Sequence, residues 1–194
     1  MPHEHASLSA KELERLALNI NPGGWAVDFE RPIATLLGSC VAVCLFDPKL
    51  RLGGMNHFLL PSRAASSNAD TDVVLAGDFA MEVLVNAMLA RGASKNRMVA
   101  KAFGGGNIVH SISMDIGMRN ASFAKEWLAQ EGISLQASDF SGPWSRKVIM
   151  VPGTGDAFCR RMPVSRPDAL AITQAEQDYA RTLAKPKEKR IELF

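Results

Sequence analysis

Apolar positions along the chain recur with two spacings, one typical of strands and one typical of helices. Runs rich in Val, Ile, Leu and Phe, bounded by turns that contain Pro or Gly, indicate strands. We expect strands at 25–29, 33–46, 51–60, 97–103, 134–140, 147–151 and 157–162. Apolar residues three and four apart predict helices at 9–19, 73–91, 116–130 and 166–183. The presence of both kinds of element favours an α+β fold.

The turn residues indicate how some of these strands pair. Asp47 and Pro48 turn the chain between two predicted strands, which we expect to form a hairpin. The hairpin would return His57 to a place beside the strand that carries Cys40. The three strands between 134 and 162 are separated by Gly- and Pro-containing turns, which predicts a meander.

The composition changes near both ends of the chain. We divide it into a partly helical N-terminal extension at 1–22, a domain at 23–163, and a C-terminal helix with a charged tail at 164–194. We interpret the last helix as packing on its own domain, with docking to a partner as the alternative. Its recurring residues are Ala171, Ala175, Tyr179 and Leu183.

The overall composition narrows the class of protein. The 194 residues are 47% hydrophobic and 22% charged, as in a chain with a packed core and a solvated exterior. A formal net charge of +2 is too small to predict nucleic-acid binding. The chain shows no signal peptide and no apolar segment long enough to span a membrane. Three cysteines are too few for a disulfide framework, so we expect a reducing, cytoplasmic location.

Cys40 and His57 are the candidate reactive pair. A free thiol is mostly protonated at neutral pH, so a nucleophilic cysteine needs an imidazole or a positive charge beside it. His57 is the best placed histidine to supply one, and we expect the two side chains to converge where a substrate can reach them. The alternative is that both are unrelated core residues.

The other candidate residues carry weaker signals. Cys44 lies about 13 Å from Cys40 if the strand is extended at ~3.3 Å per residue, too far for one metal ion to bridge. We therefore predict neither a metal nor a cofactor, and we place Cys44 and Cys159 in the core. The Gly-Gly-Gly sequence before Asn107 lacks the spacing of a phosphate-binding loop. Asn107 is a candidate hydrogen-bond partner for a substrate carboxamide, or it closes a turn.

Several ordered motifs resemble one known family. They are TLLGSCVAVCLFDP at 35–48, GGMNHFLLP at 53–61, KAFGGGN at 101–107, IGMRN at 116–120 and RKV at 146–148. In this order they are similar to the CheD family of chemoreceptor glutamine deamidases. The resemblance implies a β-sandwich-like core with helices packed outside it, a fold shared with certain toxin deamidases. It also implies conversion of glutamine side chains to glutamate on methyl-accepting chemotaxis receptors.

The chemistry of the residues agrees with that activity. A thiolate from Cys40 would attack the carboxamide carbon, and His57 would protonate the departing ammonia and then activate water. The backbone amides at Gly38 and Ser39 would approach the developing oxyanion. The resemblance also implies a threonine in the site, and Thr35 is the nearest one. Residues five apart on an unbroken strand face opposite sides of the sheet, so a bulge at Gly38 would be needed to bring Thr35 to the site.

The resemblance implies the cytoplasmic helices of chemotaxis receptors as partners, with a chemotaxis phosphatase-like adaptor as a further one. Two other functions stay open. One is a catalytically idle protein that binds receptors or adaptors, and the other is a cysteine amidase that acts on small molecules.

Overall fold

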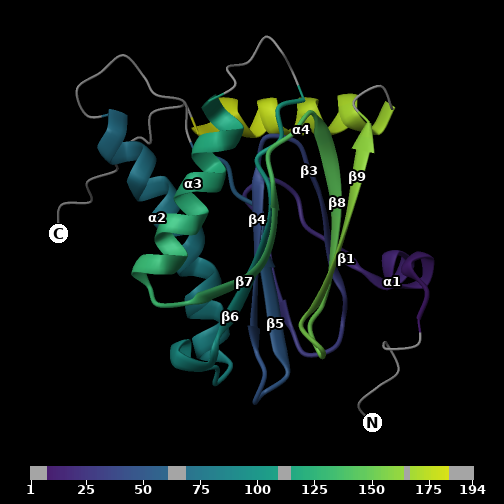
Figure 1. Cartoon of the computed structure of the whole chain (residues 1–194), viewed down its shortest axis with the longest axis vertical. Coiled ribbons are helices and arrows are strands. Elements are labelled where there is room, and N and C mark those ends of the chain that lie inside the picture. Colours follow the sequence, from purple (N-terminus) through teal and green to yellow (C-terminus); the bar gives the residue numbers. More distant parts are fainter. Residues whose placement is uncertain (1–7, 61–68, 109–114, 164–166, 184–194) are drawn as a thin grey trace, which may run out of the picture.

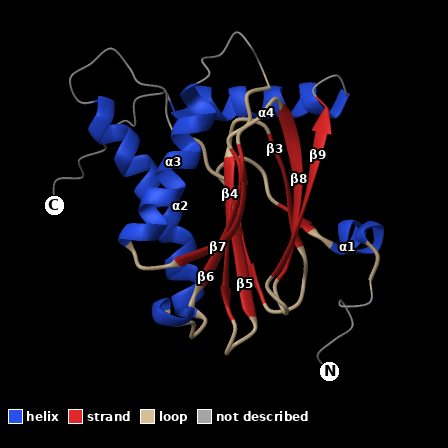
Figure 2. Ribbon diagram, in the orientation of Figure 1, coloured by secondary structure: helices blue, strands red, loops and turns tan. Residues whose placement is uncertain are grey.

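The computed structural model has the two packed sheets and flanking helices of an α+β sandwich, as Figures 1 and 2 show. It describes residues 8–60, 69–108, 115–163 and 167–183. Two helices cover one sheet, a short helix lies beside the other, and a fourth helix crosses one end of both. The predicted α+β class is confirmed. Of the helices described, none has the length and apolar character to cross a membrane.

The two sheets differ in size and pairing. The four-stranded sheet has the order β1 (Leu18–Asn19), β3 (Ile33–Leu37), β8 (Trp144–Val151) and β9 (Asp156–Pro163). The five-stranded sheet has the order β2 (Trp25–Asp28), β5 (Leu52–Asn56), β4 (Val41–Asp47), β6 (Val99–Gly104) and β7 (Ser134–Phe140). Both sheets are mixed, because β1 is parallel to β3 and β7 is parallel to β6.

Two predictions about the strands were wrong. The strand expected at 33–46 is two strands, and they lie in different sheets with Gly38, Ser39 and Cys40 between them. The strands between 134 and 162 do not form a meander, because β7 pairs with β6 in parallel while β8 and β9 form a hairpin in the other sheet. A parallel pair needs a long crossover, and the helix between β6 and β7 supplies it.

The helices pack according to their apolar faces. Helices α2 (Ala69–Ala90) and α3 (Asp115–Gln130) lie on the outer face of the five-stranded sheet. Helix α1 (Ala10–Leu16) begins with a capping box between Ser9 and Glu12 and packs on the four-stranded sheet. Helix α4 (Pro167–Leu183) crosses the end of both sheets, and a single 3-10 turn (Lys95–Arg97) precedes β6.

Strand β4 is buried on both faces, which explains its unbroken apolar sequence. Val41, Val43 and Leu45 belong to the core beneath α2 and α3, whereas Cys40, Ala42 and Cys44 face the core between the two sheets. Cys44 is buried there, and burial raises its thiol pKa to about 12. The alternation leaves Cys40 at the end of the core between the sheets, where the chain crosses from one sheet to the other.

Candidate active site

The crossover of Gly38, Ser39 and Cys40 is fixed from several sides. The N–H groups of Gly105 and Gly106 donate to the carbonyls of Cys40 and Gly38, each at 2.8 Å. The glycine-rich turn after β6 therefore supports the crossover with its backbone. Figure 2 shows this end of the sheets lying beneath α4.

Asn120 of α3 holds the same crossover, and sequence reasoning missed it as a site residue. Its side-chain N–H donates to the Ser39 carbonyl at 2.8 Å, and its oxygen accepts from the Leu60 N–H at 2.9 Å. The side chain is wholly buried, and because both ends of its amide are hydrogen-bonded it holds Ser39 and Leu60 at a fixed separation. Asn120 ends the motif IGMRN at 116–120, which drew attention to this helix but did not indicate what the side chain binds.

The hairpin of β4 and β5 returns His57 toward Cys40 as expected. The pairing of Cys44 with Met55 and the bridge between Val41 and Phe58 set this register. One ring nitrogen of His57 and the Cys40 sulfur lie within 4.8 Å of each other and of a Glu176 carboxylate oxygen.

The expectation that Cys40 and His57 meet where solvent can reach them was wrong for this structure. Cys40 is 0% exposed and His57 is 1% exposed. Burial raises the pKa of the Cys40 thiol well above its ordinary value, and the charge of Glu176 raises it further. Burial also lowers the pKa of His57 to about 3, so the imidazole is neutral. The described state holds a protonated thiol beside a neutral ring.

Thr35 reaches the site although a continuous strand would have turned it away. Its hydroxyl lies 2.8 Å from Nδ1 of His57 and donates to the Ile20 carbonyl at 2.7 Å. The expectation that Thr35 and Cys40 face opposite sides assumed one unbroken strand. It was wrong because the strand ends at Leu37, so no bulge is needed. A hydroxyl has one hydrogen, and the Ile20 carbonyl takes it, so Thr35 accepts from the Nδ1 proton. The neutral His57 then has its lone pair at Nε2, an atom with no hydrogen-bond partner among the described residues.

Glu176 of α4 is the second residue that sequence reasoning missed. Its Oε1 accepts from the N–H groups of Gly38 and Cys40 at 2.7 and 3.1 Å. Its Oε2 accepts from the N–H and hydroxyl of Ser39 at 2.8 and 2.7 Å. The signal was available, because a glutamate falls within the spacing of Ile172, Tyr179 and Leu183 on the side of α4 that faces the core.

Cys40, His57 and Glu176 offer three ligand types that metal ions accept, so the set needs a test as a metal site. Both oxygens of Glu176 already accept two hydrogen bonds each. Nδ1 of His57 is committed to Thr35. A carboxylate surrounded by backbone donors fits an anion-binding pocket better than a metal site.

Asn107 follows the glycine-rich turn, and its backbone N–H donates to the Gly142 carbonyl at 2.8 Å. This bond ties the turn to the start of β8. A contact between its side chain and a substrate carboxamide stays a prediction. His110 also follows this turn and is a weaker candidate than His57 from its place in the sequence, and it lies outside the described residues.

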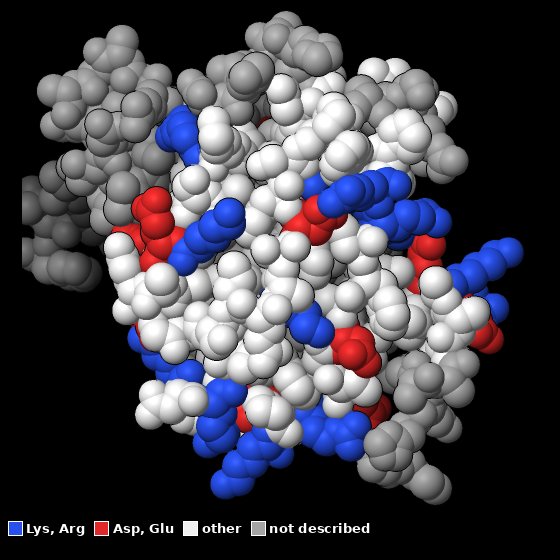
Figure 3. Space-filling view, in the orientation of Figure 1, with Lys and Arg blue, Asp and Glu red and all other residues white. Residues whose placement is uncertain are grey.

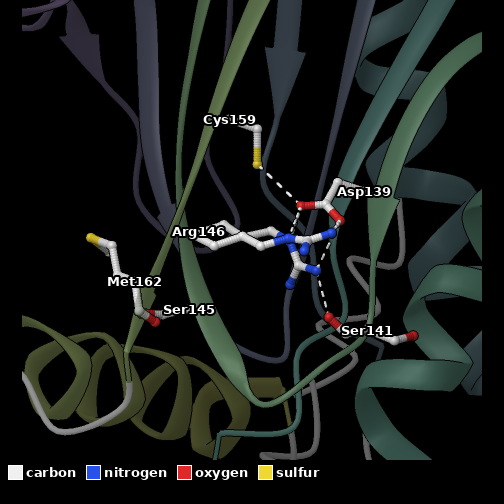
Figure 4. A network of polar contacts seen from close by, with 7 residues as sticks. Asp139, Ser141, Ser145, Arg146, Cys159 and Met162 are labelled. Atoms are coloured by element: carbon white, nitrogen blue, oxygen red, sulfur yellow. Dashed lines mark hydrogen bonds and ion pairs between the residues drawn. The ribbon is translucent and has the colours of Figure 1, made fainter.

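A partly buried ion-pair network joins strands of the two sheets, as Figure 4 shows. Arg146 of β8 is 0% exposed and donates from Nε to Asp139 of β7 at 3.1 Å and from Nη2 to the Ser141 carbonyl. Arg161 of β9 bonds the same carboxylate at 2.6 Å. These two guanidinium groups hold the pKa of Asp139 well below its usual range. Cys159 points toward this carboxylate, and burial raises its thiol pKa to about 11.

A thiol beside an imidazole that a hydroxyl orients, with backbone N–H groups at the thiol, is typical of cysteine hydrolases. The family model described as CheD chemotactic sensory transduction matches residues 59–161. The chain belongs to the CheD family.

Relatives in three bacteria bear the same kind of name. A protein of Dechloromonas aromatica named probable chemoreceptor glutamine deamidase CheD 2 is 60% identical, over 98% of this chain and 100% of its own. A protein of Burkholderia thailandensis with that name is 43% identical, over 95% and 96%. Probable chemoreceptor glutamine deamidase CheD 1 of Shewanella oneidensis is 41% identical, over 86% and 82%.

Among solved structures, the crystal structure of Bacillus licheniformis hypothetical protein YfiH aligns with 59% of this chain and 49% of its own. The identity is 15% and the TM-score is 0.36, a likeness on which nothing further rests.

Proposed function

We propose that this protein hydrolyses the side-chain amide of selected glutamines on methyl-accepting chemotaxis receptors, giving glutamate and ammonia. The observation that carries the proposal is the convergence of the Cys40 thiol, the His57 ring and the N–H groups of Gly38 and Ser39 at one place. The family to which the chain belongs supports the same reaction and substrate.

The first half of the reaction forms a thioester. Nε2 of His57 takes the proton of Cys40, and the sulfur attacks the carboxamide carbon of the bound glutamine. The carbonyl oxygen gains negative charge, and the backbone N–H groups at 38–40 stabilise it. The proton on Nε2 passes to the leaving nitrogen as the carbon–nitrogen bond breaks, so ammonia departs as a neutral molecule.

The second half returns the enzyme to its starting state. Nε2 of His57 removes a proton from water, and the hydroxide attacks the thioester carbon. The carbon–sulfur bond breaks, the sulfur recovers its proton, and the side chain leaves as glutamate. Thr35 acts as a positioning residue, since its acceptor oxygen keeps the proton of His57 on Nδ1 throughout.

Receptor glutamines lie on long helices, so the substrate is a protein surface and not a small molecule. We place the reaction in the cytoplasm, because the proposed substrate is a cytoplasmic segment of the receptor. On the face that Figure 3 shows, Lys and Arg side chains lie near Asp and Glu side chains, with uncharged residues between these groups. A chemotaxis phosphatase-like adaptor is a further proposed partner.

The test is mass spectrometry of a receptor cytoplasmic fragment incubated with the full-length protein. We expect a gain of about 1 Da for each glutamine converted, the difference between an amide and an acid. Cys40→Ala should abolish the gain. Cys159→Ala is the matched control and should retain it, because its thiol lies outside the site.

Two other results would contradict the proposal. Binding of the fragment with no change of mass indicates an idle adaptor. Release of ammonia from free glutamine at a comparable rate, with the receptor fragment unchanged, indicates an amidase of small molecules.

A further inference from the structure

Helix α4 places a carboxylate in the pocket that the proposed reaction would use. The four donors around Glu176 come from Gly38, Ser39 and Cys40, the segment that carries the candidate nucleophile. One of its carboxylate oxygens lies within 4.8 Å of the Cys40 sulfur and of one ring nitrogen of His57. Glutamate is also the product of glutamine deamidation, so the side chain in the pocket has the chemical form that the reaction would leave there.

The burial of Glu176 indicates that this contact is built into the fold. The residue is 5% exposed and lies between Ile172 and Tyr179 on the side of α4 that faces the core. Burying a carboxylate costs free energy unless donors surround it. Here three backbone N–H groups and one hydroxyl do so.

Two glycines beneath α4 lie so close to its side chains that a larger residue would collide with them. A Cβ atom at Gly38 would lie 2.9 Å from Oε2 of Glu176, and one at Gly23 would lie 2.6 Å from the Tyr179 ring. Both distances are too short for a side chain, so glycine at these positions lets the backbone of the domain approach α4. Tyr179, Ala180 and Leu183 pack against the core that contains Cys40.

We propose that α4 occupies the substrate-binding surface as a product-like helix, and that a receptor helix binds the same surface after α4 leaves, with its glutamine in the place of Glu176. This inference rests on the proposed function and adds how the substrate is presented. A helical glutamine would set its carbonyl oxygen at the N–H groups of Gly38 and Cys40.

The occupied pocket also explains the protonation state of the site. The Glu176 charge adds to the effect of burial in raising the pKa of the Cys40 thiol. Removal of α4 would remove the charge of Glu176. A receptor side chain with a neutral amide would bring no such charge, so the thiolate would form more readily beside a substrate than beside Glu176.

The decisive experiment uses the full chain with Glu176→Gln. If α4 lies as a substrate lies, the introduced amide is an intramolecular substrate. Cys40 displaces ammonia from it, water then cleaves the thioester, and the peptide gains about 1 Da. Gln174 and Gln177 lie on the same helix and are internal controls, with Gln174 exposed and bonded to Asp178. We expect conversion at position 176 alone, and none when Cys40→Ala is combined with Glu176→Gln.

A second measurement follows the receptor fragment with Glu176→Ala. Loss of the four hydrogen bonds should free the surface and raise kcat/KM by about tenfold or more, since a competing occupant lowers the fraction of competent enzyme. Gln174→Ala is the matched control on the exposed side of α4 and should leave the rate unchanged.

The outcomes separate the two proposals. If the Glu176→Gln protein converts the receptor fragment but leaves its own position 176 unchanged, α4 does not lie as a substrate, and the inference is overturned while the proposed function stands. A receptor rate that Glu176→Ala leaves unchanged or lowers also overturns it. If neither the receptor fragment nor position 176 gains mass in any of these proteins, the proposed function fails and the inference fails with it.

Discussion

The hydroxyl of Thr35 decides which nitrogen of His57 carries the proton. Its single hydrogen goes to the Ile20 carbonyl, so it accepts from Nδ1 and leaves the lone pair on Nε2. A ring with the opposite tautomer would present an N–H to Cys40 and could not take the thiol proton. The hydrogen bond to Thr35 therefore fixes the tautomer in which His57 can take up a proton at Nε2.

Thr35→Val keeps the shape of the side chain and removes the acceptor. We expect kcat on a receptor fragment to fall by about 10- to 100-fold, the effect of losing one or two buried hydrogen bonds. KM should change little, because Thr35 lies behind His57 and away from the substrate. Thr35→Ser restores the hydroxyl and should recover most of kcat. If Thr35→Ser is as slow as Thr35→Val, the methyl group matters and the orienting role is wrong.

Residue chemistry suggested Cys40 and His57 as a candidate pair, because a nucleophilic thiol needs an imidazole or a positive charge beside it, and the family resemblance supported that interpretation. It did not lead to Glu176 or Asn120. Glu176 bonds the backbone of Gly38, and Asn120 bonds the backbone of Ser39. Both partners lie more than 80 residues away in the chain and are brought near only by the fold. No short-range pattern records such a pairing.

At the scale of elements, the turn between β4 and β5 keeps the hairpin in register. Asp47 is wholly buried and accepts from the N–H groups of Lys49, Leu50 and Ser94 and from the Arg97 guanidinium. Burial alone would raise its pKa, but these donors outweigh it and lower the pKa to about 2. The carboxylate thus joins the hairpin that carries His57 to the segment after α2.

Asp47→Asn should lower the free energy of unfolding by about 2 kcal/mol at pH 7, the value of a pKa drop from 3.8 to about 2. The folded-state pKa is depressed, so this stability is present above pH 4 and is lost as the pH falls toward 2. Urea unfolding at pH 7 and at pH 3 measures it, with Asp156→Asn on an exposed turn as the control. A difference between wild type and variant that is equal at both pH values would contradict this account.

The positions of the helices and strands were largely predictable from the sequence, whereas the pairing of the strands was not. The four described helices, and the described strands other than β1, fall in segments that spacing and capping predicted. Strand β1 lies where the helix at 9–19 was expected to continue, and the end of β3 at Leu37 depends on the chain leaving one sheet for the other. A glycine at position 38 is compatible with such a break, but it is equally compatible with a continuous strand. Similarly, nothing in the sequence of β7 distinguishes pairing with β6 from pairing with β8. The stripe expected at Ala171 and Ala175 was wrong, because both are exposed and α4 turns Ile172 and Glu176 inward.

At the scale of the whole molecule, the site exists because two sheets diverge where α4 closes their end. Thr35 comes from the four-stranded sheet, His57 follows β5 of the other, and Cys40 lies on the crossover between them. Helix α4 crosses the end of both sheets, as Figure 1 shows, and its Glu176 bonds the segment that carries Cys40. Because Cys40 and His57 are buried there, their pKa values differ between the folded and unfolded chain, and the stability of the fold depends on their protonation.

His57 makes that coupling measurable. Its pKa is about 3 in the folded protein because burial disfavours the charged ring, against 6.5 for the ordinary side chain. The unfolded chain therefore binds one more proton than the folded chain between pH 3 and 6.5. The free energy of unfolding should fall with decreasing pH in this range, by about 1.4 kcal/mol per pH unit from this residue.

The test compares wild type with His57→Asn, whose amide can replace the Nδ1 donor to Thr35 but cannot take up a proton. Urea unfolding of both proteins at pH 7, 6, 5 and 4.5, followed by tryptophan fluorescence, gives two curves of stability against pH. Acidic residues and the remaining histidines contribute to both curves, so the difference in slope isolates His57. We expect the wild-type curve to fall more steeply below pH 6.5. Parallel curves would mean that the ring of His57 stays hydrated in the folded protein, and that α4 does not close the site.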